Sequence, residues 1–454
     1  MITVTADLHL HSKYSRAVSP QMTPPVMASY GKAKGIDLLA TGDWTHPVWF
    51  REIRSFLEDA EEGLYKIKNP AKDQEQTRFL LSVEIACIYS QGGKGRRIHN
   101  LVFAPSFDAA EKIDRELIKR GYNLSSDGRP IIGLSSKNLL QLLLEIDERC
   151  LLIPAHVWTP WFGIYGQMSG FNTLSEAFED LADHVYGIET GLSSDPEMNW
   201  EIEELNTRSI LSFSDAHSPA KMGREATVFQ LENLSYENIR KAIMQPSKQI
   251  AAGENKVLYT IEFYPEEGKY HYSGHRNCGV TMTPDEQLAA KGICPVCHKK
   301  VTDGVMRRVQ ELAQEKPRGK HVKNQENLMW ISDPKKEHPP FVKIVPLLEI
   351  IAEALRVPVG SPKAKVVFDH LVSTLQSEFS VLLKAPKEAI LASASHITSP
   401  QNAQRIAEGI EKVREENIVI TPGYDGVFGV VKIWYEKEQK EEPKNERSQI
   451  GLAF

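Results

Sequence analysis

Short apolar runs, separated by longer stretches of helical period, recur through the first 215 residues. Residues 3–12 carry apolar side chains at every second position, which predicts a strand whose alternate side chains share a face. Amphipathic stretches such as residues 136–149 have the period of a helix. Six further strand-like runs cover residues 36–42, 79–83, 98–103, 150–155, 185–188 and 210–214. Strands that alternate with helical crossovers predict a parallel β/α barrel with its site at one rim.

Side chains that could bind a metal lie in these runs or directly after them. His9 and His11 are two residues apart, so a strand would place both imidazoles on one side. The remaining candidates are Asp43, His46, Glu84, His99, His156, Glu189, Asp215 and His217. A single pair of histidines is often an ordinary core or surface feature. Seven strand ends that each carry His, Asp or Glu predict a metal centre.

Composition and charge limit the class of protein. The chain has 454 residues, of which 41% are hydrophobic and 25% charged, and this is typical of a soluble globular protein of more than one domain. No signal peptide and no apolar run of membrane-spanning length is evident, so we expect no contact with a membrane. The five cysteines favour a reducing cytoplasm over a disulfide framework. The net charge of −6 does not by itself suggest a nucleic-acid binder.

A small zinc-binding module is predicted over residues 256–304; it follows a turn at 251–255 and opens with a strand at 257–264. His275-x-x-Cys278 and Cys294-x-x-Cys297 have the two-knuckle spacing of one structural zinc. The alternative is a set of unpaired cytosolic thiols. The fourth ligand stays open, because His271 and His298 are rivals of His275.

A basic stretch follows the zinc module. Residues 291–343 hold twelve Lys or Arg and six Asp or Glu, and this excess suits contact with a phosphate backbone. Arg307 and Arg308 are candidate DNA contacts within it. A solvated surface is the alternative.

The C-terminal part reads as helical from residue 341. Helices are expected at residues 345–355, 365–379 and 401–416, before a short β segment at 418–434. Residues 437–448 are charged and lack apolar periodicity, which predicts disorder. Gln449-x-x-Leu452-x-Phe454 ends this tail and resembles the motif that inserts into the bacterial sliding clamp, although an inert tail is the alternative.

Taken together, the candidate ligands resemble those of the PHP (polymerase and histidinol phosphatase) superfamily. The motifs are His9-x-His11, Gly42-Asp43, Glu84, His99, His156 and Asp215-x-His217. Residues 41–47 and 154–163, with the downstream modules, are similar to the endonuclease Q family over about residues 1–436. The resemblance implies an α/β fold with a distorted (β/α)7 PHP barrel at 1–255. It also implies the zinc module at 256–304, a mainly helical domain at 305–436 and the tail at 437–454.

The resemblance further implies two or three divalent metals (Zn, Mn or Mg). Their ligands would be His9, His11, Asp43, Glu84, His99, His156, Asp215 and His217, and either His46 or Glu189 could assist. Many PHP enzymes have an Asp where residues 14–17 read Tyr-Ser-Arg-Ala, which leaves the third metal open. The family nicks DNA on the 5′ side of deaminated bases, so a flipped base is expected. Trp44, Trp158, Trp161 and Phe162 would contact that DNA, or else fill the core.

Three functions therefore remain open. The first is a nucleoid-associated DNA repair endonuclease acting at uracil, hypoxanthine, xanthine or abasic sites in double- or single-stranded DNA. The second is a small-molecule phosphatase of the histidinol phosphatase type, which needs neither a zinc module nor a clamp motif. The third is a non-catalytic clamp-bound DNA-binding protein, for which unpaired buried ligands would be costly.

Overall fold

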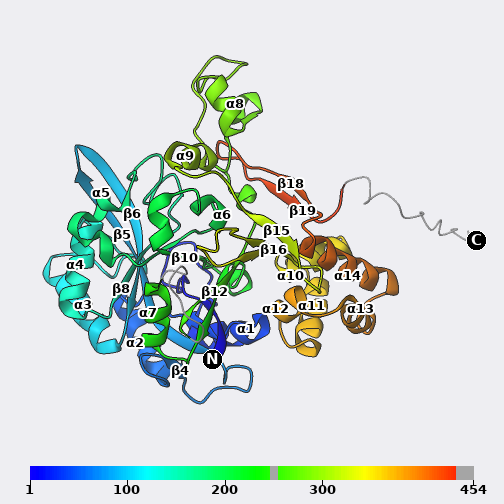
Figure 1. The fold of residues 1–454 in the computed structure, drawn as a ribbon. Coiled ribbons are helices and arrows are strands. Elements are labelled where there is room, and N and C mark those ends of the chain that lie inside the picture. The colour runs from blue at the N-terminus through cyan, green and yellow to red at the C-terminus, as the bar shows by residue number, and fades with distance from the viewer. Residues whose placement is uncertain (246–253, 436–454) are drawn as a thin grey trace, which may run out of the picture.

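A computed structural model describes residues 1–245 and 254–435 of the chain. The predicted tail at 437–454, with its clamp-like motif, and most of the turn predicted at 251–255 lie outside the described residues. A barrel-like α/β body carries a small projecting module and a separate group of helices (Figure 1). None of the helices in the described ranges combines the length and apolarity that crossing a bilayer requires.

The centre of the body is one mixed sheet. Three strands in a row run parallel in it, β1 (Ile2–Asp7), β2 (Leu38–Ala40) and β5 (Arg78–Gln91), in that order. The other strands of this sheet are β3 (Leu57–Asp59), β4 (Tyr65–Ile67), β6 (Lys94–Ala104), β7 (Ile131–Ile132), β8 (Leu151–Pro154), β11 (Ala226–Leu231), β12 (Lys256–Glu262), β15 (Lys320–Lys323), β16 (Met329–Ser332) and β17 (Phe341–Lys343). A separate parallel pair is formed by β9 (Gly187–Glu189) and β10 (Ser209–Leu211).

The predicted parallel β/α barrel is only partly parallel in this sheet. β1 pairs antiparallel with β11, and β6 pairs antiparallel with both β5 and β8. β5 and β6 form a long hairpin because Gly92 and Gly93 both take left-handed backbone angles, with φ of 61° and 72°. A tight turn of this kind needs no crossover helix.

Helices cover the outside of the body. The predicted helix near residues 136–149 is α4, which follows the cap residue Ser135 and turns Leu139, Leu140 and Leu143 to the core. The helices of this part are α1 (Pro24–Lys34), α2 (Pro47–Phe56), α3 (Phe107–Lys119), α4 (Ser136–Ile146), α5 (Leu174–Phe178), α6 (Pro196–Asn199) and α7 (Tyr236–Met244).

The sheet continues beyond the domain boundary predicted at residue 255. β12 corresponds to the strand predicted at 257–264, and it pairs antiparallel with β11 and parallel with β17. Residues on both sides of residue 255 therefore share one core, while the division into domains stays a prediction.

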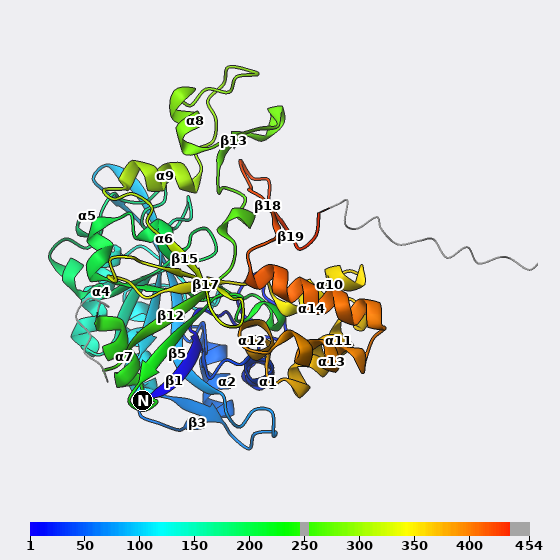
Figure 2. The same cartoon turned by 45° about the vertical axis from the view of Figure 1, so that its right-hand side comes forward.

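The projecting module contains β13 (Ser273–His275), β14 (Val280–Met282) and α8 (Pro284–Ala289), and α9 (Val305–Leu312) connects it to the body (Figure 2). Met282, Cys294 and Val301 form its own small core. Asp425 ties the module to the C-terminal hairpin, because it accepts hydrogen bonds from Arg276 N (2.8 Å) and Thr302 Oγ1 (2.6 Å).

Five helices and a hairpin form the C-terminal part. They are α10 (Leu347–Leu355), α11 (Pro362–Thr374), α12 (Glu378–Leu383), α13 (Lys387–Ser395), α14 (Pro400–Arg414), β18 (Val419–Thr421) and β19 (Val430–Lys432). The prediction of helix from residue 341 is wrong at its start, since residues 341–343 are strand β17 and α10 begins only after Pro346. A buried ion pair of 2.7 Å between Lys34 of α1 and Glu378 of α12 docks these helices on the body.

Candidate metal centre

His9 and His11 lie directly after β1. The strand is shorter than predicted and ends at Asp7, but an isolated bridge between Leu10 and Ala216 keeps this segment extended. Both imidazoles therefore reach the same interior space, with ring centroids 5.1 Å apart. Their side chains are 1% and 0% exposed.

Glu84 is shared between two groups of potential ligands. Its Oε1 lies 2.5 Å from His99 Nδ1 and 3.0 Å from His156 Nε2. Its two oxygens also lie 3.8 Å from His9 Nε2 and 3.7 Å from His11 Nε2. One buried carboxylate thus faces four imidazoles, and the sequence could not have indicated that this residue is the shared one.

Asp215 and His217 complete the constellation from the loop after β10. Asp215 Oδ1 lies 2.9 Å from His11 Nε2 and 3.7 Å from His9 Nε2. His217 Nδ1 lies 3.6 Å from the same carboxylate oxygen. Three overlapping groups result, His9–His11–Glu84, Glu84–His99–His156 and His11–Asp215–His217.

Three imidazoles are fixed through the nitrogen that faces away from these groups. His9 Nδ1 lies 2.9 Å from Glu189 Oε1, and His11 Nδ1 lies 3.2 Å from Asp43 Oδ1. His156 Nδ1 lies 2.8 Å from Thr159 Oγ1. Metal-binding histidines are held in this manner, because a partner on one ring nitrogen directs the other at the ion.

The donor atoms fit divalent metals. Ligands about 2.0–2.2 Å from an ion lie roughly 3–3.6 Å from one another, which matches the contacts of Glu84 with His156 and of Asp215 with His11. His9 Nε2 is buried without a hydrogen-bond partner among the described residues, although it points at two carboxylates. An orphaned donor in that position is the arrangement that a bound cation satisfies.

Strong fields act on these side chains. Burial opposes a charged carboxylate, but His99, His156 and His9 hold the pKa of Glu84 well below its ordinary value. Burial likewise opposes protonation of His11, yet Asp215 and Asp43 raise its pKa to about 9. Perturbations of both kinds cluster at functional sites.

Asp43 and His46, both predicted as possible metal ligands, contact groups outside the ligand constellation in the structure. Asp43 belongs to none of the ligand groups in the described chain; it accepts hydrogen bonds from Ser12 N (2.6 Å) and Ser15 Oγ (2.8 Å) and faces the back of His11. Asp43 therefore orients His11 in this structure, and its prediction as a metal ligand stays a prediction. His46 caps α2, where it accepts from Trp49 N, and lies outside the constellation.

Asp7 is a supporting residue that the sequence reasoning missed. Its buried carboxylate accepts hydrogen bonds from Ser214 N (3.0 Å), Ser214 Oγ (2.6 Å) and Gly223 N (2.9 Å). It thereby fixes the loop that carries Asp215. Residues 7, 9 and 11 alternate along the predicted strand, and this spacing could have indicated that Asp7 lies near the two histidines.

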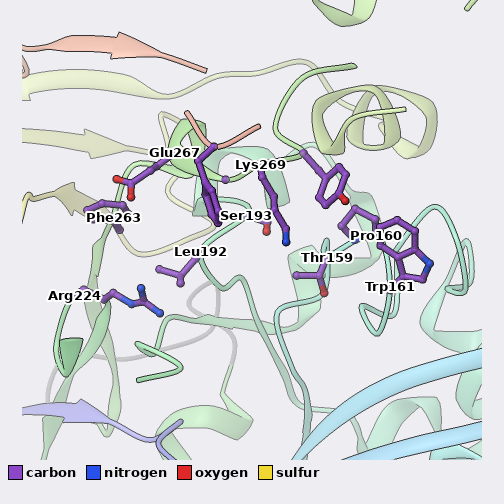
Figure 3. Close-up of a pocket in the computed structure, with 12 residues that line it drawn as sticks. Thr159, Pro160, Trp161, Leu192, Ser193, Arg224, Phe263, Glu267 and Lys269 are labelled. Carbon is purple, nitrogen blue, oxygen red and sulfur yellow. The ribbon is translucent and has the colours of Figure 1, made fainter. Parts of the chain in front are cut away.

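A pocket of about 330 Å³ adjoins the metal centre. Figure 3 shows Thr159, Pro160 and Trp161 toward one side of it and Phe263 and Glu267 toward the other. Thr159 contacts His156, and Arg224 donates to the carbonyl oxygen of Ser214 (2.9 Å) and, more weakly, to that of Asp215 (3.4 Å). Two side chains that line the pocket therefore contact a ligand, His156, or the backbone beside another, Asp215.

Two of the aromatic residues predicted to contact DNA are buried, which corrects that assignment. Trp44 and Trp158 are 0% and 1% exposed, so neither can stack on a nucleotide in this conformation. Phe162 packs against His99 with ring centroids 4.3 Å apart. Trp161, at 38% exposed, remains accessible at the edge of the pocket.

The two arginines predicted to contact DNA also differ from each other. Arg308 is buried and donates to the carbonyl oxygens of Tyr165 (3.0 Å) and Phe171 (3.1 Å), so it braces a loop rather than facing solvent. Arg307 is half-buried and lines a surface cavity.

A second group of ligands lies in the projecting module. His275, Cys278, Cys294 and Cys297 bring their ligand atoms within 4.8 Å of one another. His271 and His298, the rivals for the fourth position, are not part of this group. The set of one imidazole and three thiols suits zinc.

Comparison with known proteins gives a consistent result. No family model matches the chain. It is 27% identical to the uncharacterised protein MJ0043 of Methanocaldococcus jannaschii over 298 residues, 62% of this chain, and that match spans only 32% of the archaeal protein. It is 25% identical over 447 residues to the uncharacterised protein YqxK of Bacillus subtilis, covering 95% of this chain and 100% of YqxK.

Two solved structures resemble the whole chain. The lesion-specific endonuclease PfuEndoQ from Pyrococcus furiosus has a TM-score of 0.78 and 29% identity, covering 99% of each chain. Endonuclease Q in complex with a 27-mer duplex that has an abasic lesion at the active site also gives 0.78 and 29%, covering 98% of this chain and 100% of that one. The likeness extends through the body, the projecting module and the C-terminal helices.

Proposed function

Because this chain belongs to the endonuclease Q family of metal-dependent hydrolases, we propose that it is a DNA repair endonuclease. It hydrolyses the phosphodiester on the 5′ side of a deaminated base (uracil, hypoxanthine or xanthine) or of an abasic site. The observation that carries the proposal is the position of Glu84, a single buried carboxylate that faces four imidazoles beside a pocket.

The side chains of the centre divide into two layers. His9, His11, Glu84, His99, His156, Asp215 and His217 would hold two or three divalent ions, with Glu84 and His11 each shared between groups. Zn, Mn and Mg are the candidate ions. When bound, they neutralise charge on the scissile phosphate and activate water for attack. Glu189, Asp43 and Thr159 act behind the ligands by orienting His9, His11 and His156.

The adjoining pocket is the place for the displaced nucleotide. Its volume of about 330 Å³ lies at the lower end of the ~300–1,000 Å³ range of ligand sites. Trp161 offers an exposed aromatic face at its edge, on which a base can stack. Arg224, which contacts the backbone beside Asp215, would place the pocket's polar edge next to the scissile phosphate.

Further proposals concern the rest of the chain. One structural zinc is held by His275, Cys278, Cys294 and Cys297 and stabilises the projecting module. The tail that ends in Gln449-x-x-Leu452-x-Phe454 docks on a sliding clamp, which keeps the enzyme on nucleoid DNA in the cytoplasm. Its substrate is double-stranded or single-stranded DNA that carries a damaged base.

The test uses end-labelled duplexes carrying uracil, hypoxanthine, xanthine or an abasic site, with and without Mn or Mg. We expect one cut, 5′ of the lesion, that requires metal and is lost in Glu84→Gln, with unmodified duplex as the control. Phosphate release from histidinol phosphate without any nicking would replace this proposal by a small-molecule phosphatase. DNA binding without turnover of either substrate would replace it by a non-catalytic scaffold.

A further inference from the structure

The surface between the tip of the β5–β6 hairpin and the projecting module contains two adjoining cavities. One, of about 610 Å³, lies between the hairpin tip and the loop at residues 167–172; the other, of about 250 Å³, lies between that loop and the residues around α8. Gln167 and Glu311 line both cavities, so the two adjoin and are together called the groove. Both cartoon views show the hairpin tip, α9 and α8 on the same side of the molecule (Figures 1 and 2).

The groove is basic on an acidic protein. Its lining includes six cations, Lys94, Arg96, Lys291, Lys300, Arg307 and Arg308, and three acids, Glu176, Asp303 and Glu311. Of the cations, Arg96 and Arg308 are held by backbone carbonyls of the neighbouring loops and contribute charge without facing solvent as freely as the others. The chain as a whole has a net charge of −6. This local reversal of sign matches the charge of a nucleic-acid backbone.

Two of these cations are free to bind a ligand. Lys94 and Lys291 are exposed, and neither has an ion-pair partner within the described residues. The acids of the groove are partly engaged already: Glu311 pairs with Arg308 at 3.0 Å, and Glu176 accepts from Asn172 N at 2.8 Å. Unpaired lysines that flank a polar channel are suited to phosphates, which need point charges and no specific base edge.

The groove is connected to the metal centre by one strand. Lys94 and His99 both lie on β6, five residues apart, which is about 17 Å at roughly 3.3 Å per residue. Each strand of B-DNA has one phosphate per ~3.4 Å of axis, so that distance corresponds to about five base pairs. A duplex whose axis follows β6, with its scissile phosphate at the metal centre, therefore reaches the groove about five base pairs away.

We propose that this groove, with Lys94 on one wall and Lys291 on the other, is a track for the phosphate backbone of the duplex about five base pairs from the nick. The inference rests on the proposed function and adds a site that positions the duplex on one side of the lesion. Since the contacts are to phosphates, the groove contributes affinity and salt dependence without reading sequence.

The experiment compares Lys94→Ala, Lys291→Ala and the double variant with the wild type, with Lys72→Ala as the matched control. Lys72 is exposed and lies before the first residue of β5, whereas the hairpin tip follows the last residue of that strand. Binding to an abasic duplex is measured by fluorescence anisotropy between 50 and 300 mM salt. For each lysine we expect about threefold to tenfold weaker binding and a log–log salt slope smaller by about 0.9. Lys94→Arg should restore both, and Lys72→Ala should change neither.

Duplex length supplies the second measurement. Shortening one flank of the lesion below about five base pairs should weaken wild-type binding, and the double variant should be insensitive to that truncation. A double variant with the wild-type salt slope and length dependence would overturn the groove proposal, provided that the wild type nicks the lesion. A wild type that nicks no lesion defeats the proposed function instead, and the salt slope on plain duplex then still decides whether the groove binds DNA.

Discussion

Glu189→Gln tests whether the metal centre depends on residues behind its ligands. Glu189 is fully buried, and its carboxylate lies 2.9 and 3.0 Å from His9 Nδ1 and accepts from His156 N at 2.8 Å. It thus supports one histidine from each of the two groups that share Glu84. Gln has nearly the same shape but only one accepting atom, so one of the two donors must lose its acceptor.

The magnitude follows from that single lost contact. A hydrogen bond to a charged group contributes about 1.5–3 kcal/mol, and loss of partners behind metal ligands commonly costs about 10–100-fold in metal affinity or activity. The two figures agree, because tenfold corresponds to about 1.4 kcal/mol. We therefore expect the metal concentration for half-maximal nicking to rise about 10–100-fold. At saturating metal the rate should recover to within about tenfold of wild type, since the ligands themselves are intact.

The assay is the initial nicking rate of an abasic duplex against Mn concentration. Glu58→Gln is the matched control, because Glu58 is an exposed residue of strand β3 and pairs with Lys66 at 3.4 Å on the surface. Thermal melts of both variants separate loss of metal from loss of fold. A Glu189→Gln enzyme with unchanged metal dependence would refute the role assigned to Glu189. A correctly folded variant that excess metal does not rescue would also refute it, since Glu189 would then act in the chemical step itself.

Four further perturbations address other parts of the chain. His9→Ala or Asp215→Ala should reduce nicking at least about 10³-fold with little change in melting temperature, and normal cutting by either would contradict the ligand assignment. Cys294→Ser should weaken DNA binding, seen by anisotropy, more than it lowers barrel metal content, seen by elemental analysis of the protein. Burial raises the pKa of Glu262 to about 8, although hydrogen bonds from two hydroxyl groups act to lower that pKa. The folded protein therefore keeps a proton on Glu262 that the unfolded chain releases above about pH 5. Stability should therefore fall between about pH 5 and pH 8, and Glu262→Gln should reduce that fall by about 1–3 kcal/mol in urea melts, whereas parallel pH profiles would contradict it. Deleting residues 449–454 should leave nicking unchanged and abolish clamp pull-down; retained clamp binding would discard the docking motif.

Sequence reasoning succeeded where chemistry is tied to local pattern. The positions of His156 and Asp215 followed from apolar runs that stop before a polar residue, and the spacing of His275 and Cys278 indicated the second cluster. Glu84 was predicted to follow a strand that ends at residue 83, but β5 continues to Gln91 and Glu84 lies in its middle. It failed where the answer depends on packing. No periodicity shows that Trp44 is buried, and nothing in the sequence shows that the carboxylate of Asp43 faces the back of an imidazole.

The element that breaks the parallel barrel also builds the metal centre. In the antiparallel register of β5 and β6, His99 lies opposite Ala86, so Glu84, two residues earlier on the same face, is its diagonal neighbour. A slip of one residue would turn one of these side chains to the other face of the sheet. The glycine turn at the tip of the hairpin fixes that register, and the same tip presents Lys94 to the groove. One hairpin therefore sets both the contact of Glu84 with His99 and the distance between the metal centre and the proposed phosphate track.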